Sequence, residues 1–201
     1  MPVGRYRVMD GEGRAVGIEE FRCAPGPAGW RYFSDIETSE PDPHRERVDF
    51  VVDGEWRPVR LVVQTGSHSL VLEAVGDALV GERDGEAIEL PFGPEMEIDY
   101  LSPAFNAVTA NRLTGTTEIE VVYLEPVTCQ PVPMGQRYEL LEAEDRVETP
   151  VGTFVAARWR YTALPTGWTR TLWVAGDVVV AYPGVFELEA YEAGSRGPFP
   201  A

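Results

Sequence analysis

Residues 154–174 read FVAARWRYTALPTGWTRTLWV, and this stretch decides the fold class of the chain. Aliphatic and aromatic side chains recur at every second position on both sides of a Pro-Thr-Gly sequence. Successive side chains of a strand point to opposite faces of a sheet, so a period of two predicts two β-strands. Residues 118–123, EIEVVY, show the same alternation and predict a third strand.

The turn within this stretch determines how the first two strands pair. A hairpin closed by residues 164–167 places Arg160 opposite Thr171 and Arg158 opposite Trp173, all on one face of the sheet. Arginine above tryptophan forms a cation–π pair, and the same guanidinium could instead bind an anionic head group. A register shifted by one residue would exchange the two faces.

Glycine-containing turns divide much of the remaining chain into short strands. They lie between apolar or alternating runs, often about ten residues apart, at residues 10–13, 53–54, 65–67, 75–77, 84–85 and 175–177. Asp-Gly suits hairpin loops because both residues tolerate a positive φ angle. This spacing is typical of antiparallel all-β proteins, and no break in composition separates two parts, so we expect one domain over residues 1–201.

Residues 102–112, SPAFNAVTANR, form the single candidate helix. Ser102 stands where an N-cap belongs, and Pro103 occupies the first helical position. The β-branched residues and two asparagines make a turn-rich crossover an equal alternative.

The charge balance limits the classes of partner. The chain has 33 acidic and 17 basic residues and a net charge of −16, which argues against binding to nucleic acids and anionic membranes. It contains no apolar run long enough to span a membrane, and its first residues lack the apolar stretch of a secretory signal, so we expect a cytoplasmic protein. Two cysteines, Cys23 and Cys129, are too few for a disulfide framework and are expected to stay reduced and unpaired.

Motifs of known enzyme chemistry are mostly missing. The sequence has no Gly-x-Ser-x-Gly elbow, no phosphate-binding glycine loop and no pair of metal-binding histidines on a helix, so we expect neither cofactor nor metal. Glu95, Glu97 and Asp99 alternate in a strand-like run, a pattern that favours a solvated face.

Residues 97–106, EIDYLSPAFN, followed by NRL at 111–113, resemble a bacterial family named for glycolipid binding and built as a spiral β-roll. Further matching segments are DGEWR at 53–57 leading into LVV at 61–63, VVY at 121–123, QRY at 136–138 and YPGVF at 182–186. The family usually has Pro-Phe-Thr-Asn where this chain has Pro-Ala-Phe-Asn. Residues 148–174 are also similar to the closing strands of β-roll proteins related to lipoprotein carriers.

The resemblance implies one strongly curved antiparallel sheet, a half-barrel with an apolar concave side, wrapped around residues 102–112. We expect a non-catalytic protein that binds an amphipathic lipid or glycolipid. Aromatic rings and a few fixed polar groups would form the site. The residues we expect to contact the ligand are Trp30, Tyr100, Asn106, Arg112, Tyr123, Arg137, Trp159 and Trp173.

Two other functions fit the same sequence. The first is an enzyme, an isomerase or cyclase acting on a hydrophobic metabolite, with Tyr100, Asp99 or Glu97 as acid–base groups; a perturbed carboxyl group inside the cavity would favour it. The second is a structural module whose edge strands pair in a homodimer. Arg112 also has an alternative role, in which it only bonds nearby carbonyls and holds the crossover in place.

Overall fold

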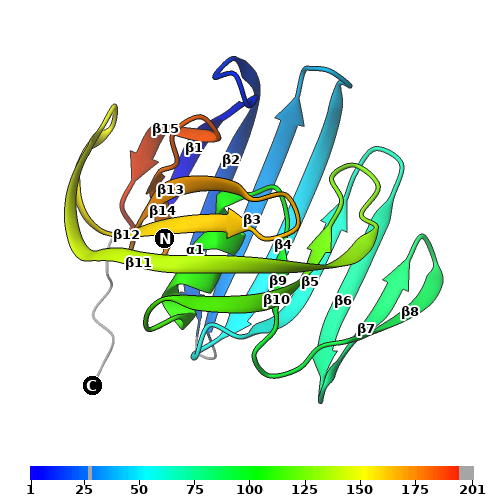
Figure 1. Cartoon of the computed structure of the whole chain (residues 1–201). Helices are drawn as coiled ribbons and strands as arrows, with labels where there is room; N and C mark the ends of the chain where they lie inside the picture. Colours follow the sequence, from blue (N-terminus) through cyan, green and yellow to red (C-terminus); the bar gives the residue numbers. More distant parts are fainter. Residues whose placement is uncertain (27–28, 195–201) are drawn as a thin grey trace.

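The computed structural model describes residues 1–26 and 29–194, which form two curled sheets around one helix (Figure 1). Strands account for 66% of this part of the chain. The predicted all-β fold, strongly curved around a single short helix, is confirmed. The hydrogen bonds divide the strands into one sheet of nine and one of six.

The first sheet has the strand order β15-β1-β2-β3-β4-β5-β6-β7-β8. Its strands are β1 (Val3–Met9), β2 (Ala15–Gly26), β3 (Gly29–Thr38), β4 (His44–Asp53), β5 (Pro58–Gln64), β6 (Ser69–Val75), β7 (Ala78–Arg83), β8 (Glu86–Pro91) and β15 (Phe186–Glu192). The second sheet has the order β14-β13-β12-β11-β10-β9. Its strands are β9 (Glu97–Asp99), β10 (Thr117–Leu124), β11 (Pro131–Thr149), β12 (Gly152–Ala163), β13 (Trp168–Ala175) and β14 (Val178–Ala181).

The glycine turns lie where the sequence places them, each between two consecutive antiparallel strands. In the turn between β1 and β2, Asp10 Oδ1 accepts the backbone N–H groups of Glu12 at 2.9 Å and Arg14 at 2.8 Å. Gly13 has a φ angle of +83°, a conformation that glycine adopts without steric cost. The side chain of Asp10 thus accepts two backbone N–H groups within the turn and so stabilises it.

The predicted register of the β12–β13 hairpin is confirmed, with Arg158 opposite Trp173 and Arg160 opposite Thr171. A carboxylate connects the first of these pairs. Trp173 Nε1 donates to Asp145 Oδ2 at 2.9 Å, and Arg158 Nη1 lies 3.4 Å from the same oxygen.

Residues 103–112 are helical, so the helix and not the turn-rich crossover is observed. Helix α1 (Pro103–Arg112) begins after the N-cap Ser102, whose side chain accepts the Ala104 N–H, and it ends with Leu113 N–H bonded to the Thr109 carbonyl. The helix connects β9 to β10, which are parallel, whereas the sequence predicted antiparallel strands throughout. Parallel neighbours require such a crossover, because a tight turn can only reverse the chain.

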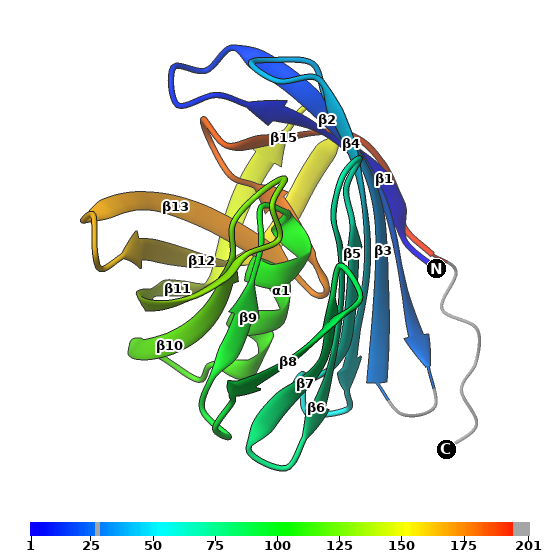
Figure 2. The same ribbon diagram turned by 90° about the vertical axis from the view of Figure 1, so that its right-hand side faces the viewer.

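Helix α1 lies between the two sheets, and Figure 2 shows it from the side. Every residue from Pro103 to Ala110 is buried. Phe105 stacks on Phe50 of β4 with ring centroids 4.6 Å apart, and it meets Tyr100 edge-on at 6.0 Å. The helix therefore fills the space that the inner face of the first sheet would otherwise leave open.

Outward-facing side chains of the first sheet form ion pairs across neighbouring strands, such as Arg31 with Asp49 and Arg47 with Asp35. Inward-facing positions of the same strands are apolar and buried, for example Val48 and Phe50. This contrast is the one-sided burial expected of a sheet that covers a core. Both cysteines are unpaired, as predicted, and both are buried.

The stacked ring at Phe105 gives a first prediction. Phe105→Ala should lower the free energy of unfolding by about 3–5 kcal/mol, because it opens a cavity beneath the helix. Val155→Ala is the matched control, since Val155 is 68% exposed, and it should change stability by less than about 0.5 kcal/mol. Urea denaturation followed by circular dichroism measures both, and equal effects would contradict this view of the core.

Candidate functional site

A cavity of about 550 Å³ lies where the second sheet, the β9–α1 connection and the turn between β14 and β15 meet. Its volume is within the range of small-molecule sites in proteins. Aromatic and aliphatic side chains form most of its wall: Tyr100, Leu101, Tyr123, Met134, Tyr161, Ala163, Trp168, Tyr182, Val185 and Phe186. The polar residues of the wall are Asp99, Ser102, Asn106 and Thr166.

Sheet register brings the aromatic rings together. Ala163 of β12 pairs with Trp168 of β13, so Trp168 lies on the same face of the sheet as Tyr161, two residues before Ala163. The rings of Tyr161 and Trp168 meet edge-on with centroids 5.8 Å apart. Opposite them, the turn that leaves β14 places the ring of Tyr182 6.1 Å from that of Phe186.

Asp99, at the end of β9, is the carboxylate of the cavity wall. It is 9% exposed, and its Oδ2 accepts a hydrogen bond from Gln136 Nε2 at 2.5 Å. Burial raises the pKa of Asp99 to about 6, although the hydrogen bonds from Gln136 and from the Tyr100 backbone lower it in part. No arginine or histidine of the described residues forms an ion pair with Asp99.

The tyrosines around Asp99 keep their hydroxyl protons. Burial, and then the charge of Asp99, raise the pKa of Tyr123 to about 12 and the pKa values of Tyr161 and Tyr182 further. Their hydroxyl groups are therefore hydrogen-bond donors over the whole physiological pH range. The cavity thus combines apolar rings with neutral polar groups and a single carboxyl group.

Helix α1 supplies the amide of the cavity. Asn106 points away from Phe105 toward the second sheet, and its Nδ2 donates to the hydroxyl oxygen of Tyr138 at 2.8 Å. Asn106 is buried yet lines the cavity. This hydrogen bond to Tyr138 fixes the orientation of the Asn106 amide before any ligand binds.

Three of the eight predicted ligand-binding residues, Tyr100, Asn106 and Tyr123, line this cavity. Trp30 lies elsewhere, stacked on Trp56 with ring centroids 4.5 Å apart. Trp159 is buried on the same face of β12 as Tyr161 but does not line the cavity, and its ring centroid lies 6.3 Å from that of Tyr138.

The predicted arginines and Trp173 are also outside the cavity. Arg137 lies on the outer face of β11 near Glu139, because its neighbours Gln136 and Tyr138 point inward. Trp173 lies on the outer face of β13 for the same reason. Arg112, at the C-terminal end of α1, donates to the carbonyls of Met96 and Pro94 and to Glu97, which is the alternative role that the sequence left open.

The sequence prediction missed most of the aromatic wall, namely Tyr161, Trp168, Tyr182 and Phe186. A signal for two of them existed, since the correct hairpin register already puts Trp168 on the same face as Tyr161. The YPGVF segment was noticed only as part of the family resemblance, yet it supplies three lining residues, Tyr182, Val185 and Phe186.

The prediction of a solvated face for Glu95, Glu97 and Asp99 was wrong for Glu97 and Asp99, which are buried. Glu97 Oε1 receives a hydrogen bond of 2.5 Å from Arg112 Nη1. Burial raises the pKa of Glu97 to about 7 despite this arginine. An alternating charged pattern marks one face of a strand, and the other elements of the fold decide whether water reaches that face.

A third buried carboxyl group, Glu19 of β2, joins the first sheet to the helix. Its Oε1 accepts hydrogen bonds of 2.7 Å from Ser34 Oγ and from Ser102 Oγ, the N-cap of α1. Burial raises the pKa of Glu19 to about 7, and the two serines oppose this shift. Its other oxygen, Oε2, has no hydrogen-bond partner among the described residues.

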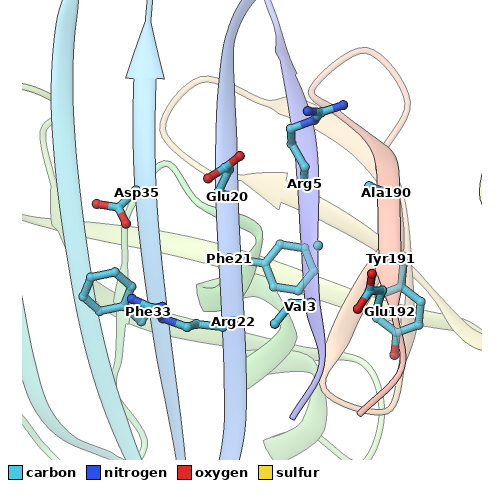
Figure 3. A pocket seen from close by; sticks show the side chains of 11 residues that line it. Val3, Arg5, Glu20, Phe21, Arg22, Phe33, Asp35, Ala190, Tyr191 and Glu192 are labelled. Carbon is cyan, nitrogen blue, oxygen red and sulfur yellow. The ribbon is translucent and has the colours of Figure 1, made fainter.

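The outer surface of the first sheet is hollowed over β15, β1, β2 and β3, and Figure 3 shows the side chains there. Arg5, Glu20, Arg22 and Asp35 surround the hollow, and the Arg22 guanidinium lies 4.3 Å from the ring centroid of Phe33. Arg5 pairs with Glu189 and Asp35 with Arg47, so charged groups of this hollow already have partners on the outer surface. We therefore place the candidate site in the inner cavity.

The described part of the chain has no cluster of metal ligands and no helix that could span a membrane. No three histidine, cysteine or carboxylate side chains there come together as metal ligands. No helix in that part is both long and apolar enough to cross a bilayer.

Comparison with known proteins supports the fold. No protein-family model and no curated protein matches the chain. Among solved structures, it is similar to a DUF1089 family protein from Pseudomonas aeruginosa, with a TM-score of 0.62 and 23% identity over 84% of this chain and 91% of that one. It is also similar to a β-barrel-like protein of the domain of unknown function DUF1849 from Brucella abortus, with a TM-score of 0.53 and 7% identity over 95% and 96% of the two chains. Likeness at these identities shows a shared fold, and the function must be argued from the site.

The ion pair between Arg112 and Glu97 gives the next prediction. Arg112→Leu should lower the free energy of unfolding by about 3 kcal/mol, because it leaves a buried carboxyl group without its partner. Arg137→Leu makes the same substitution at an exposed outer position, where an ion pair contributes less than about 1 kcal/mol. Urea denaturation at pH 8 compares the two, and a loss at Arg112 no larger than that at Arg137 would refute the structural role.

The buried carboxyl groups also predict how stability depends on pH. The pKa values of Glu19, Glu97 and Asp99 are higher in the folded chain than the ordinary values of 4.5 and 3.8. Between about pH 4.5 and 7 the folded state therefore binds more protons than the unfolded state, so the free energy of unfolding should fall as pH rises through this window.

Glu19→Gln should reduce this slope, because glutamine cannot ionise yet still accepts from both serines. Glu20→Gln, at the exposed neighbouring position, should leave the slope unchanged. Denaturation curves at pH 5, 6, 7 and 8 provide the measurement. Stability that stays level or increases over this range would show that these carboxyl groups ionise as freely as in the unfolded chain.

Proposed function

We propose that the protein binds one small amphipathic molecule, of the lipid or glycolipid class, in the cavity beside Asp99 and Asn106. The main observation that supports this proposal is the composition of the cavity wall, which is mostly aromatic and aliphatic with a few fixed polar groups. An apolar chain would lie against the rings, and the polar head would reach the carboxyl, amide and phenol groups. A wholly apolar interior would instead pack as core.

The mouth of the cavity supports entry of an apolar ligand. Leu101 and Trp168 both line the cavity and are 44% and 38% exposed. Leu164, in the turn just before Trp168, is also exposed. Large apolar side chains gathered at an opening often mark a site of ligand or partner contact.

The sequence resemblance to the glycolipid-binding family also supports this proposal. The segments that carry the resemblance to the glycolipid-binding family supply Asp99, Asn106, Tyr123, Tyr182 and Phe186 to one cavity. Those segments are far apart in the sequence, so their convergence on one cavity links the resemblance to a site.

Acid–base catalysis is a second candidate, favoured by Asp99 alone. A carboxyl group with a raised pKa inside a cavity can take up and return a proton, and nearby neutral phenols can stabilise an oxyanion. This would suit an isomerase acting on a hydrophobic carbonyl compound. A compound that binds, and that exchanges its α-hydrogen with deuterated water only when Asp99 is present, would favour the enzyme.

Binding can be tested with a single aromatic residue of the wall. Trp168→Ala should weaken the binding of decyl-chain amphiphiles about tenfold, measured by isothermal titration calorimetry below their critical micelle concentrations. Trp30→Ala removes the same side chain at a stacked pair outside the cavity and should leave affinity unchanged. Equal loss in both variants would place the binding elsewhere.

Protein purified without detergent offers an independent measurement. Native mass spectrometry should show one added mass per chain, which Ala163→Phe removes by filling the cavity. Thermal unfolding of Ala163→Phe checks that the fold survives. An added mass that persists in a folded Ala163→Phe variant would argue against this cavity.

A further inference from the structure

Asp99 differs from the other carboxylates in the interior of the described chain. Glu97 has Arg112 as its counterion, Glu46 lies 3.3 Å from His44 Nε2, and Glu19 accepts from two serines. Asp99 receives one side-chain hydrogen bond, from Gln136, and faces a cavity large enough for a ligand. Buried charges in proteins are normally paired, so a carboxylate in a cavity wall points to a cation that arrives from outside.

The rings around Asp99 suit the same kind of ligand. Tyr123 of β10, Tyr161 of β12, Trp168 of β13 and Tyr182, which follows β14, line the same cavity as Asp99, and the charge of Asp99 acts on the three tyrosines. The face of an aromatic ring carries negative charge and attracts cations, and cages of such rings recognise alkylated ammonium groups. Trp168 already contacts one cation of the chain on this face of the sheet, since Arg170 lies opposite Tyr161 and its guanidinium carbon is 4.9 Å from the Trp168 ring centroid.

We infer that the ligand head recognised here is an organic ammonium cation, held against Asp99 by Tyr123, Tyr161, Trp168 and Tyr182. This inference rests on the proposed function, whose amphipathic ligand it specifies. No basic residue lines the cavity, which disfavours an anionic head. The net charge of −16 attracts a cation from solution and repels an anion.

The neighbouring strands carry the charged and titratable groups around Asp99. They are Tyr123 on β10, Tyr138 on β11, Tyr161 on β12, Arg170 on β13 and Tyr182 after β14. The phenols remain neutral because burial and the Asp99 charge raise their pKa values. Arg170 is occupied by the Trp168 ring and by the Thr169 carbonyl, to which its Nη1 donates at 2.9 Å.

With a permanently charged ligand, the pH dependence of binding affinity reports on the ionisation of Asp99. A quaternary ammonium group does not titrate, so any change of affinity with pH reports on the protein. Burial raises the pKa of Asp99 to about 6, and the ionised form is the one that attracts the cation. Affinity should therefore be constant above about pH 7 and should fall as pH drops below about 6.

Three decyl amphiphiles with the same chain separate the possible heads: decyltrimethylammonium, decyl glucoside and decyl sulfate. Isothermal titration at pH 7.5, below each critical micelle concentration, should show the ammonium binding at least tenfold more tightly than the glucoside, with no binding of the sulfate. Tetramethylammonium alone should bind far more weakly than the decyl compound, because it lacks the chain.

Asp99→Asn provides the decisive variant. It keeps the shape of the side chain and removes its charge, so it should weaken ammonium binding at least tenfold and leave glucoside binding unchanged. Glu120→Gln, at an exposed position of β10, removes one acidic charge outside the cavity. It is the control for the effect of the protein's overall negative charge on cation binding. If Asp99→Asn fails to fold, the pH dependence of the unaltered protein decides, and constant affinity between pH 7.5 and 5 overturns the inference.

The remaining outcomes separate this inference from the proposed function. Tighter binding of the glucoside than the ammonium would leave the proposed function standing and overturn the ammonium assignment. Equal weakening by Asp99→Asn and Glu120→Gln would also overturn it, since only the overall charge would matter. If no amphiphile binds the unaltered protein, the proposed function itself fails.

Discussion

A helix enclosed by protein cannot rely on water to satisfy the polar groups at its ends, so the surrounding structure must supply the partners. In this protein Ser102 Oγ accepts the Ala104 N–H at one end of α1, the Thr109 carbonyl accepts the Leu113 N–H at the other, and a side chain at each end bonds a different sheet. The N-cap hydroxyl of Ser102 donates to Glu19 of β2, and the side chain of Arg112 reaches Glu97 of β9. These two connections hold the helix against both sheets, and with it Ser102 and Asn106, the groups that the helix and its cap place in the cavity wall.

The two sides of the helix have different surroundings. Phe105 fills the space toward the first sheet by stacking on Phe50, and that side is closed core. Toward the second sheet, Asn106 reaches Tyr138 and the packing stops short of the β14–β15 turn, which leaves the cavity. The ten-residue helix α1 lies between the two sheets and separates them. Aromatic rings of the second sheet line the cavity that α1 does not fill.

The local features of the fold could be predicted from the sequence because they depend on a few neighbouring residues. The glycine turns, the Ser102 cap and the β12–β13 register are of this kind. The cavity depends instead on which face of each strand turns inward, and one residue of difference exchanges the faces. The sequence therefore predicted Arg137 and Trp173 as ligand contacts, whereas their neighbours Gln136 and Leu172 are the residues that point inward. Burial of Glu97 and Asp99 could not be predicted because the elements that cover β9 are distant in the sequence.

The pairing of β1 with β15 affects how the chain reaches its folded state. Val3 lies opposite Glu192, so the outer edge of β1 has no hydrogen-bonding partner strand until β15 has been synthesised. At ordinary translation rates this interval is roughly ten to forty seconds. An unpaired strand edge can add strands from other chains, and charged side chains on it discourage this. Arg5 and Arg7 lie on β1, so the emerging edge is guarded by two positive charges, which pair with Glu189 and Glu187 once β15 is in place.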